Sequence, residues 1–107
     1  MREKLTDAEL NIMNVLWKHN GRLSAARIFD EIVCQTGWHR NTVYTHINKC
    51  IKRGAIERYG TRFMCKALVN REEVQKREIS DLVIKLFEGS YENFIVTAVK
   101  AQKSFAK

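Results

Sequence analysis

The sequence predicts a mainly α-helical protein with one small β-hairpin, and three observations lead to this prediction. Five segments carry apolar residues at the three- and four-residue spacing of amphipathic helices, each bounded by a helix start or stop signal. Between the third and fourth segments the period shortens to two, as in a strand. A chain of 107 residues, 45% hydrophobic and 29% charged, suits one globular domain with a small appendage.

Two segments near the N-terminus each have the signals of a short helix. In "LTDAELNIMNVLWKHNG" Thr6 and Glu9 have the spacing of a capping box, and Gly21 can end the helix. In "LSAARIFDEIVCQTG" Ser24 is the expected N-cap and Gly37 the stop. The apolar positions are Ile12, Met13, Leu16 and Trp17 in the first helix, and Ile28, Phe29, Ile32 and Val33 in the second.

The stretch "GWHRNTVYTHINKCIKRGAI", residues 37–56, predicts a third helix of about residues 40–53. Its apolar positions recur at helical spacing at Val43, Ile47, Cys50 and Ile51. The period then changes, because residues 56–58 lead into "YGT" and residues 62–66 roughly alternate. We therefore expect two short strands joined by a turn at Gly60 and Thr61.

Two more helices are expected after the hairpin. Asn70 and Glu73 can start the fourth, Gly89 can end it, and Ser90 can cap the fifth. Their apolar positions are Ile79, Leu82, Val83, Leu86 and Phe87, then Tyr91, Phe94, Ile95, Ala98 and Val99. The expected domains are therefore residues 1–69 and a helical region of residues 70–107.

Three short helices followed by a hairpin is the element order of a winged helix-turn-helix, in which the third helix enters the DNA major groove. With its apolar positions turned inward, that helix carries polar and basic residues outward. Those near its start are suited to base edges and those near its end to phosphates, while two arginines flank the hairpin turn. The candidate DNA-binding residues are Arg40, Asn41, Thr42, Tyr44, Thr45, Asn48, Lys49, Lys52, Arg53, Arg58 and Arg62.

The charge favours a polyanionic partner, nucleic acid before membrane. The chain has 19 Lys and Arg against 12 Asp and Glu, a net charge of +7, and Glu57 is the only acid between Cys34 and Lys66. The competing interpretation is that this basic face serves solubility alone.

The motifs "LTDAELNIMNVLWKHNG" and "GWHRNTVYTHINKCIKRGAI", with the hairpin after them, resemble the penicillinase-repressor (BlaI/MecI/CopY) family of winged-helix transcriptional repressors. The resemblance extends from about Leu5 to Val99. Its most specific positions are Ala8, Glu9, Met13, Trp17, Trp38, Thr42, Thr45, Lys52, Arg53 and Gly54.

That resemblance implies a homodimer on a palindromic DNA operator, joined through the C-terminal helices. The two helices agree with this, because alone they could not fully bury their apolar positions. The expected dimer contacts are Ile79, Leu82, Val83, Leu86, Phe87, Phe94, Ile95 and Val99. The other possibility is that these helices fold back on their own winged domain.

The sequence departs from the family pattern at several points. Arg40 replaces a Pro at the start of the third helix, Cys50 replaces a core Leu, and the hairpin turn looks shorter. The Asn-Phe bond at which antibiotic-responsive members are cleaved aligns with Thr97-Ala98, and no Cys follows Cys65 to form the cluster of copper-responsive members. The inducing signal, and any sensor or protease partner, are left open.

Other kinds of site have little support in the sequence. His19, His39, His46, Cys34, Cys50 and Cys65 include metal-ligand types, but no pair has CxxC or HxxxH spacing, and Cys34 and Cys50 are expected to face the core. No cofactor, metal or catalytic residue is expected, since there is no phosphate loop or nucleophile elbow. We expect a reduced, cytoplasmic protein without a membrane span. The rival function is a winged protein-interaction adaptor without sequence-specific DNA binding.

Overall fold

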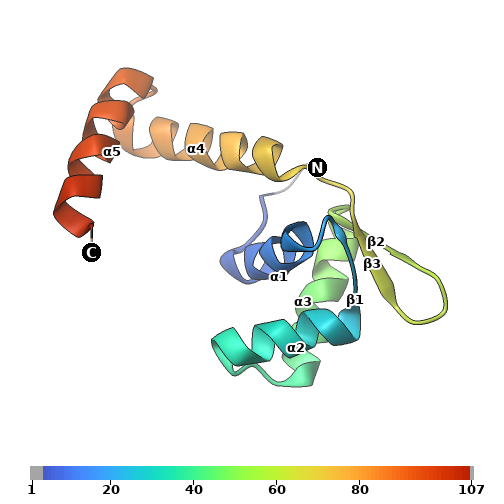
Figure 1. The fold of residues 1–107 in the computed structure, drawn as a ribbon. Helices are drawn as coiled ribbons and strands as arrows, with labels where there is room; N and C mark the ends of the chain where they lie inside the picture. The colour runs from blue at the N-terminus through green and yellow to red at the C-terminus, as the bar shows by residue number, and fades with distance from the viewer. Residues whose placement is uncertain (1–3, 107) are drawn as a thin grey trace. The chain divides into compact units, whose positions relative to one another are not determined.

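The computed structural model describes residues 4–106 and confirms a mainly helical chain with five helices at the predicted places (Figure 1). No helix in this range is both long and apolar enough to cross a bilayer. The elements in chain order are α1 (Asp7–Lys18), β1 (Arg22–Ser24), α2 (Ala25–Thr36), α3 (Arg40–Lys52), β2 (Ile56–Tyr59), β3 (Met64–Ala67), α4 (Arg71–Phe87) and α5 (Tyr91–Phe105).

The sheet has one more strand than the predicted hairpin. Its order is β1-β3-β2, with β3 antiparallel to both neighbours and Cys65 opposite both Leu23 and Arg58. Three residues are too few to display an alternating pattern, so nothing local marks β1 as a strand. Pairing with the distant β3 makes it one.

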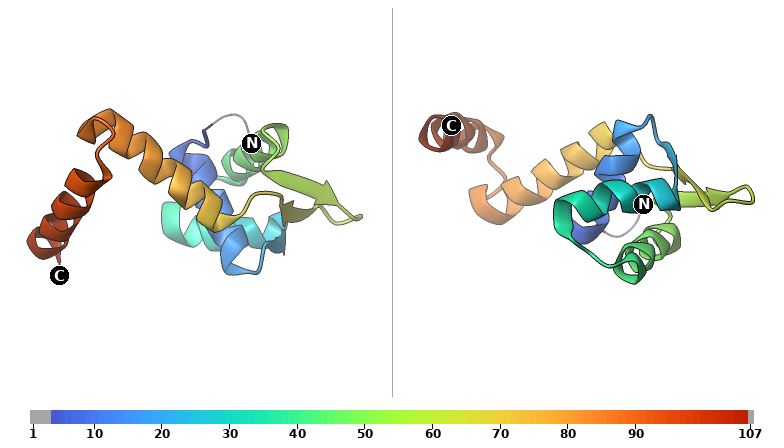
Figure 2. Two further views of the ribbon diagram at one scale, coloured as in Figure 1. Left: turned by 90° about the horizontal axis from the view of Figure 1, so that it is seen from above. Right: turned by 60° about the horizontal axis from the view of Figure 1, so that its bottom comes forward.

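The turn of the hairpin is also longer than predicted, because β3 begins at Met64 and not at Arg62. Phe63 has a φ of 48°, which is a left-handed conformation that cannot continue a strand. We call β2, β3 and residues 60–63 between them the wing. Figure 2 shows it projecting beyond the three N-terminal helices.

The predicted caps of the first two helices are confirmed. Thr6 and Glu9 form a reciprocal capping box, and the Ser24 hydroxyl accepts a hydrogen bond from the Arg27 N–H. Gly37 ends α2 with a φ of 71°. Both helices therefore begin where the side-chain signals place them, and α2 ends at the predicted Gly37. Helix α1 ends earlier than predicted, at Lys18, and Asn20 and Gly21 follow it with φ values of 62° and 82°.

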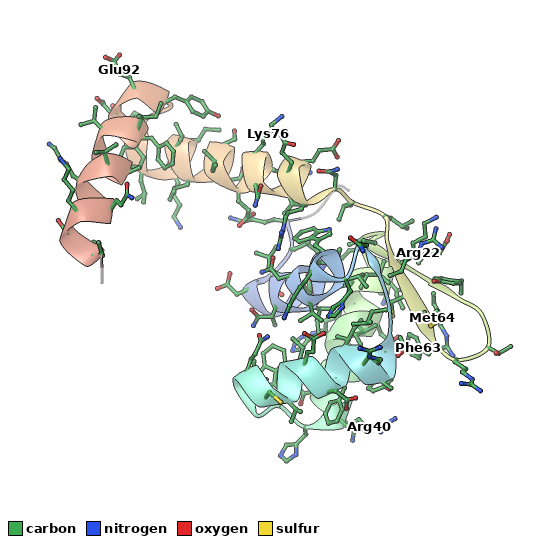
Figure 3. The ribbon with its side chains drawn as sticks, in the orientation of Figure 1. Arg22, Arg40, Phe63, Met64, Lys76 and Glu92 are labelled. Carbon is green, nitrogen blue, oxygen red and sulfur yellow. The ribbon has the colours of Figure 1, made fainter. Side chains whose placement is uncertain are left out.

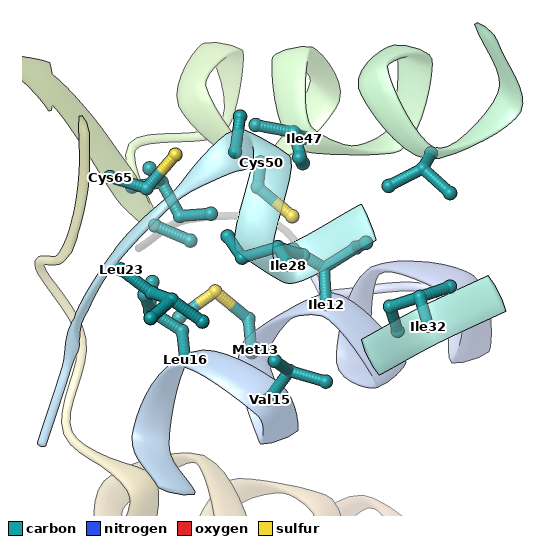
Figure 4. Packing of buried hydrophobic residues seen from close by; sticks show 14 of the residues in the cluster. Ile12, Met13, Val15, Leu16, Leu23, Ile28, Ile32, Ile47, Cys50 and Cys65 are labelled. Carbon is teal, nitrogen blue, oxygen red and sulfur yellow. The ribbon is translucent and has the colours of Figure 1, made fainter. Parts of the chain in front are cut away.

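A single apolar core joins α1, α2, α3 and the sheet (Figure 4). The fully buried side chains include Ile12, Met13, Leu16, Ile28, Ile32, Val43, Ile47, Cys50 and Cys65. The prediction that Cys34 faces this core was wrong, because its thiol is exposed. Cys34 lies two residues after the buried Ile32, about 200° around the helix, and so on the opposite face.

Contacts divide the chain into two compact units, of which the first ends at Arg71 and the second begins at Glu72. In the second unit, Val83 of α4 is completely buried, and Phe87 packs edge-on against Phe94 of α5 with ring centroids 5.6 Å apart. Val83 is thus already buried, and Phe87 and Phe94 already contact each other, within a single copy of the chain. Their role in a dimer stays a prediction.

Candidate nucleic-acid interface

Helix α3 has a buried face and an exposed polar face on opposite sides. Val43, Ile47 and Cys50 are fully buried. The exposed residues Asn41, Thr45, Asn48 and Lys52 have a matching helical spacing shifted by two residues, which turns them about 200° away from the buried face. Lys49 is exposed beside them. The core therefore fixes which side chains α3 presents to solvent.

Two residues of this face are linked within the helix. The Thr45 hydroxyl donates a hydrogen bond of 2.8 Å to the carbonyl oxygen of Asn41. Because its hydrogen is used there, Thr45 can meet another molecule as an acceptor or through its methyl group. The Asn41 side chain has both a donor and an acceptor, the pair that bidentate contact with adenine requires.

Arg40, at the first position of α3, packs on aromatic rings. Its guanidinium carbon lies 5.2 Å from the Tyr44 ring centroid and 5.9 Å from that of Phe29 in α2, and Nη2 donates to the Tyr44 hydroxyl at 3.3 Å. The side chain is nevertheless exposed. It is a cation held by stacking at the start of the polar face. Thr42, the remaining predicted residue of this turn, is half-buried.

Arg53, predicted to contact phosphate, has an acidic partner inside the protein. Its Nε lies 2.8 Å from Oε1 of Glu9, a side chain that is only 1% exposed. The sequence motif assigned Glu9 to the capping box, which it forms, but spacing alone could not reveal a partner 44 residues away. Arg53 thereby ties the end of α3 to the start of α1.

The wing carries one exposed arginine in β2 and one in its turn. Arg58 in β2 and Arg62 in the turn are exposed, and the Arg58 guanidinium lies 3.8 Å from the ring centroid of Phe63. Arg22 of β1 lies 5.9 Å from the Tyr59 ring centroid. Neither Phe63 nor Arg22 was among the residues that the sequence predicted for this surface. Phe63 is the last residue of the turn segment "RYGTRF", and Arg22 lies in a strand too short to be recognised from its sequence.

The basic charge is concentrated in this part of the chain. Seven of the 19 Lys and Arg lie from Cys34 to Lys66, against one acid, Glu57. The remaining residues are close to neutral, so α3 and the wing carry most of the net charge of +7. Such a surface attracts the phosphate backbone of nucleic acid.

The cysteines and histidines do not come together as a metal site. Within residues 4–106 no three His, Cys, Asp or Glu side chains are grouped closely enough to hold a metal ion. His46 packs against Trp38 with ring centroids 5.1 Å apart, and His19 contacts Glu31. Burial raises the pKa of Cys50 to about 12 and that of Cys65 to about 11, so both thiols stay protonated.

These features define a winged-helix protein with a basic, solvent-facing third helix. A family model described as "Penicillinase repressor" matches residues 5–107. The chain belongs to the penicillinase-repressor family, as its motifs predicted.

Known members and a solved structure agree with this assignment. The chain is 25% identical over 101 residues to the methicillin resistance regulatory protein MecI of Staphylococcus aureus, covering 92% of this chain and 81% of MecI. It is 30% identical over 56 residues to the penicillinase repressor of Bacillus licheniformis, covering 52% of this chain and 43% of that protein. The solution structure of the DNA-binding domain of the repressor BlaI matches with a TM-score of 0.59 and 25% identity, over 68% of this chain and 93% of that domain.

Proposed function

We propose that the chain is a sequence-specific DNA-binding transcriptional repressor that acts as a homodimer on a palindromic operator. The observation that carries the proposal is the exposed face of α3, where Asn41, Thr45, Asn48 and Lys52 stand opposite a fully buried apolar face. Polar side chains held on a rigid helix are what contact with base edges in the major groove requires. The family membership supports the same function.

The residues of the interface divide by their chemistry. Asn41, Thr45 and Asn48 are the proposed contacts to base edges, and Lys49 and Lys52 the contacts to phosphates. Arg58 and Arg62 of the wing would contact the adjacent backbone. The half-buried Thr42 is a weaker candidate, and Arg53 is assigned to positioning α3 through Glu9.

Arg40 is the proposed source of a distinct base preference. Its guanidinium is exposed and held beside Tyr44 at the start of α3, the end that enters the groove first. A guanidinium there can donate two parallel hydrogen bonds to a guanine edge. Replacing Arg40 with Ala should relax the preference at one base pair of each half-site.

The homodimer is proposed from the second unit. Its exposed apolar side chains are Ile79, Leu82, Ile84, Leu86, Tyr91, Ile95, Val96, Val99 and Phe105. Contiguous exposed apolar side chains are typical of protein–protein interaction sites. A second copy of the chain would cover it, and a two-fold dimer would place two α3 helices on the half-sites of a palindrome.

The direct test is binding of the purified full chain to the duplex upstream of its own gene. Fluorescence anisotropy should give affinity about a thousandfold or more tighter than for random duplex at the same salt concentration. Sedimentation equilibrium should give a dimer. Weak binding that has the same affinity for every duplex and is abolished by moderate salt would overturn the repressor assignment and favour the adaptor.

A further inference from the structure

Phe63, labelled in Figure 3, contacts three different elements at the edge of the proposed interface. Its carbonyl oxygen accepts a hydrogen bond of 2.9 Å from the N–H of Ala25, the first residue of α2. Its ring meets the Tyr44 ring of α3 edge-on, with centroids 5.6 Å apart and planes at 75°. On the wing, the Arg58 guanidinium carbon lies 3.8 Å from its ring centroid.

The backbone at Phe63 is in a conformation that large side chains rarely adopt. Its φ is 48°, in the left-handed region that glycine occupies without a steric penalty. Gly60 of the same turn, with a φ of 71°, is such a glycine. A strained conformation persists only where the surrounding structure enforces it, and such positions concentrate at functional sites. Here the hydrogen bond from Ala25 and the two ring contacts hold it.

We propose that Phe63 is a positioning residue of the DNA interface, which fixes the Arg58 guanidinium beside α3 before DNA binds. This inference rests on the proposed DNA-binding function, and in it Phe63 acts through Arg58. Phe63 carries no charge and need not touch DNA. Its ring is the surface against which an otherwise flexible arginine is ordered.

The contacts form one continuous stack from the recognition helix to the wing. Arg40 packs on Tyr44, Tyr44 meets Phe63, and Phe63 carries Arg58. An exposed arginine loses rotamer freedom when it contacts a phosphate, and that loss weakens binding. Stacking on Phe63 removes part of that freedom in the free protein. It also sets the spacing between the wing cation and the polar face of α3.

The test compares Phe63→Leu with Phe63→Tyr in the full-length protein. Leu meets the same backbone restriction but has no ring, whereas Tyr keeps the ring. Phe63→Leu should weaken duplex binding about threefold to tenfold, whereas Phe63→Tyr should bind the duplex with the affinity of the wild type. Because no charge is removed, the salt dependence of Phe63→Leu should match the wild type, while Arg58→Ala should reduce the salt slope by about one unit.

A double-mutant cycle distinguishes positioning from a general loss of stability. If Phe63 acts through Arg58, Phe63→Leu should have no further effect on binding in the Arg58→Ala background. A structural defect would persist there, and would also lower the thermal midpoint of both Leu variants. Equal weakening by Phe63→Leu in the two backgrounds would overturn the proposal.

A second measurement needs no DNA. In the NMR spectrum of the free protein, the Arg58 Hδ and Hε protons should be shifted upfield by the Phe63 ring, and Phe63→Leu should abolish the shift. The matched control is Tyr59→Leu, which removes a wing ring near Arg22 and should leave the Arg58 protons unchanged. Unshifted Arg58 protons in the wild type would refute the proposal. If the wild type shows no sequence preference among duplexes, the proposed repressor function is wrong. The NMR comparison still tests separately whether the Phe63 ring orders Arg58.

Discussion

Lys52 and Arg53 are adjacent cations at the end of α3, yet their surroundings differ. Lys52 is exposed on the polar face, whereas Arg53 is paired with a carboxylate that is almost completely buried. Taking away one partner of a buried ion pair leaves an uncompensated charge in the interior. Replacing Arg53 should therefore lower the stability of the protein, whereas replacing Lys52 should not.

We predict that Arg53→Met destabilises the protein by about 3 kcal/mol, because it leaves Glu9 buried without this cation. Urea unfolding followed by circular dichroism measures the change. Lys52→Met is the matched control and should stay within about 0.5 kcal/mol of the wild type. Equal stability of the two variants would show that the Glu9–Arg53 pair does not hold α3.

The three thiols should differ in reactivity. Cys34 is exposed, whereas Cys50 and Cys65 are buried, with pKa values raised by burial from 9.0 to about 12 and about 11. Since the thiolate is the reactive form, Ellman's reagent at about pH 8 should modify Cys34 alone in the folded protein and all three cysteines in urea. Cys34→Ser should then show no rapid reaction. Fast modification of a second thiol would contradict the buried core.

The raised pKa values of Cys50 and Cys65 should make the folded protein less stable at alkaline pH. The folded protein keeps its Cys50 and Cys65 protons to higher pH than the unfolded chain does. The two protonated thiols therefore make their full contribution to the free energy of unfolding below pH 9.0. That contribution is lost as the pH rises toward 11 or 12. Cys50→Val should reduce the fall in the free energy of unfolding over this range, and Cys34→Ser should not.

Two groups of residues on α3 should contribute to DNA binding in different ways, one by recognising bases and the other by attracting phosphates. Replacing Asn41 or Thr45 with Ala should weaken operator binding by about 1–3 kcal/mol and relax preference at one base pair, with the salt slope kept. Lys52→Ala should weaken all duplexes similarly and flatten the salt slope by about one unit. Salt-titrated anisotropy on operator and random duplexes measures both. Unchanged operator binding in all three variants would exclude α3 as the recognition helix.

The whole molecule combines a winged unit with a second unit that exposes apolar side chains, and the proposed dimer depends on the second. Ile95→Lys places a charge at a 58% exposed apolar position of α5. We predict that sedimentation equilibrium shifts it toward monomer and that operator binding falls by an order of magnitude or more, because the two half-sites are no longer bound together. The thermal unfolding of the winged unit should be unchanged.

Thr97→Lys is the control for that variant. Thr97 is exposed on α5 two residues after Ile95, about 200° around the helix, so it adds the same charge to a different face. It should remain dimeric and bind the operator like the wild type. A monomeric Thr97→Lys, or a dimeric Ile95→Lys, would show that the second copy does not pack where we propose.

The sequence by itself determined the helices, the caps of α1 and α2, the polar face of α3 and the family. These follow from local rules, since a capping box spans three residues and an amphipathic face repeats every three or four. The pairing of Arg53 with Glu9, the third strand β1 and the contact between the Phe63 and Tyr44 rings join residues far apart in the chain. The exposure of Cys34 and the burial of Val83 likewise depended on which faces the neighbouring elements cover. Only the tertiary structure decided these features, because long-range packing leaves no periodic signal in the sequence.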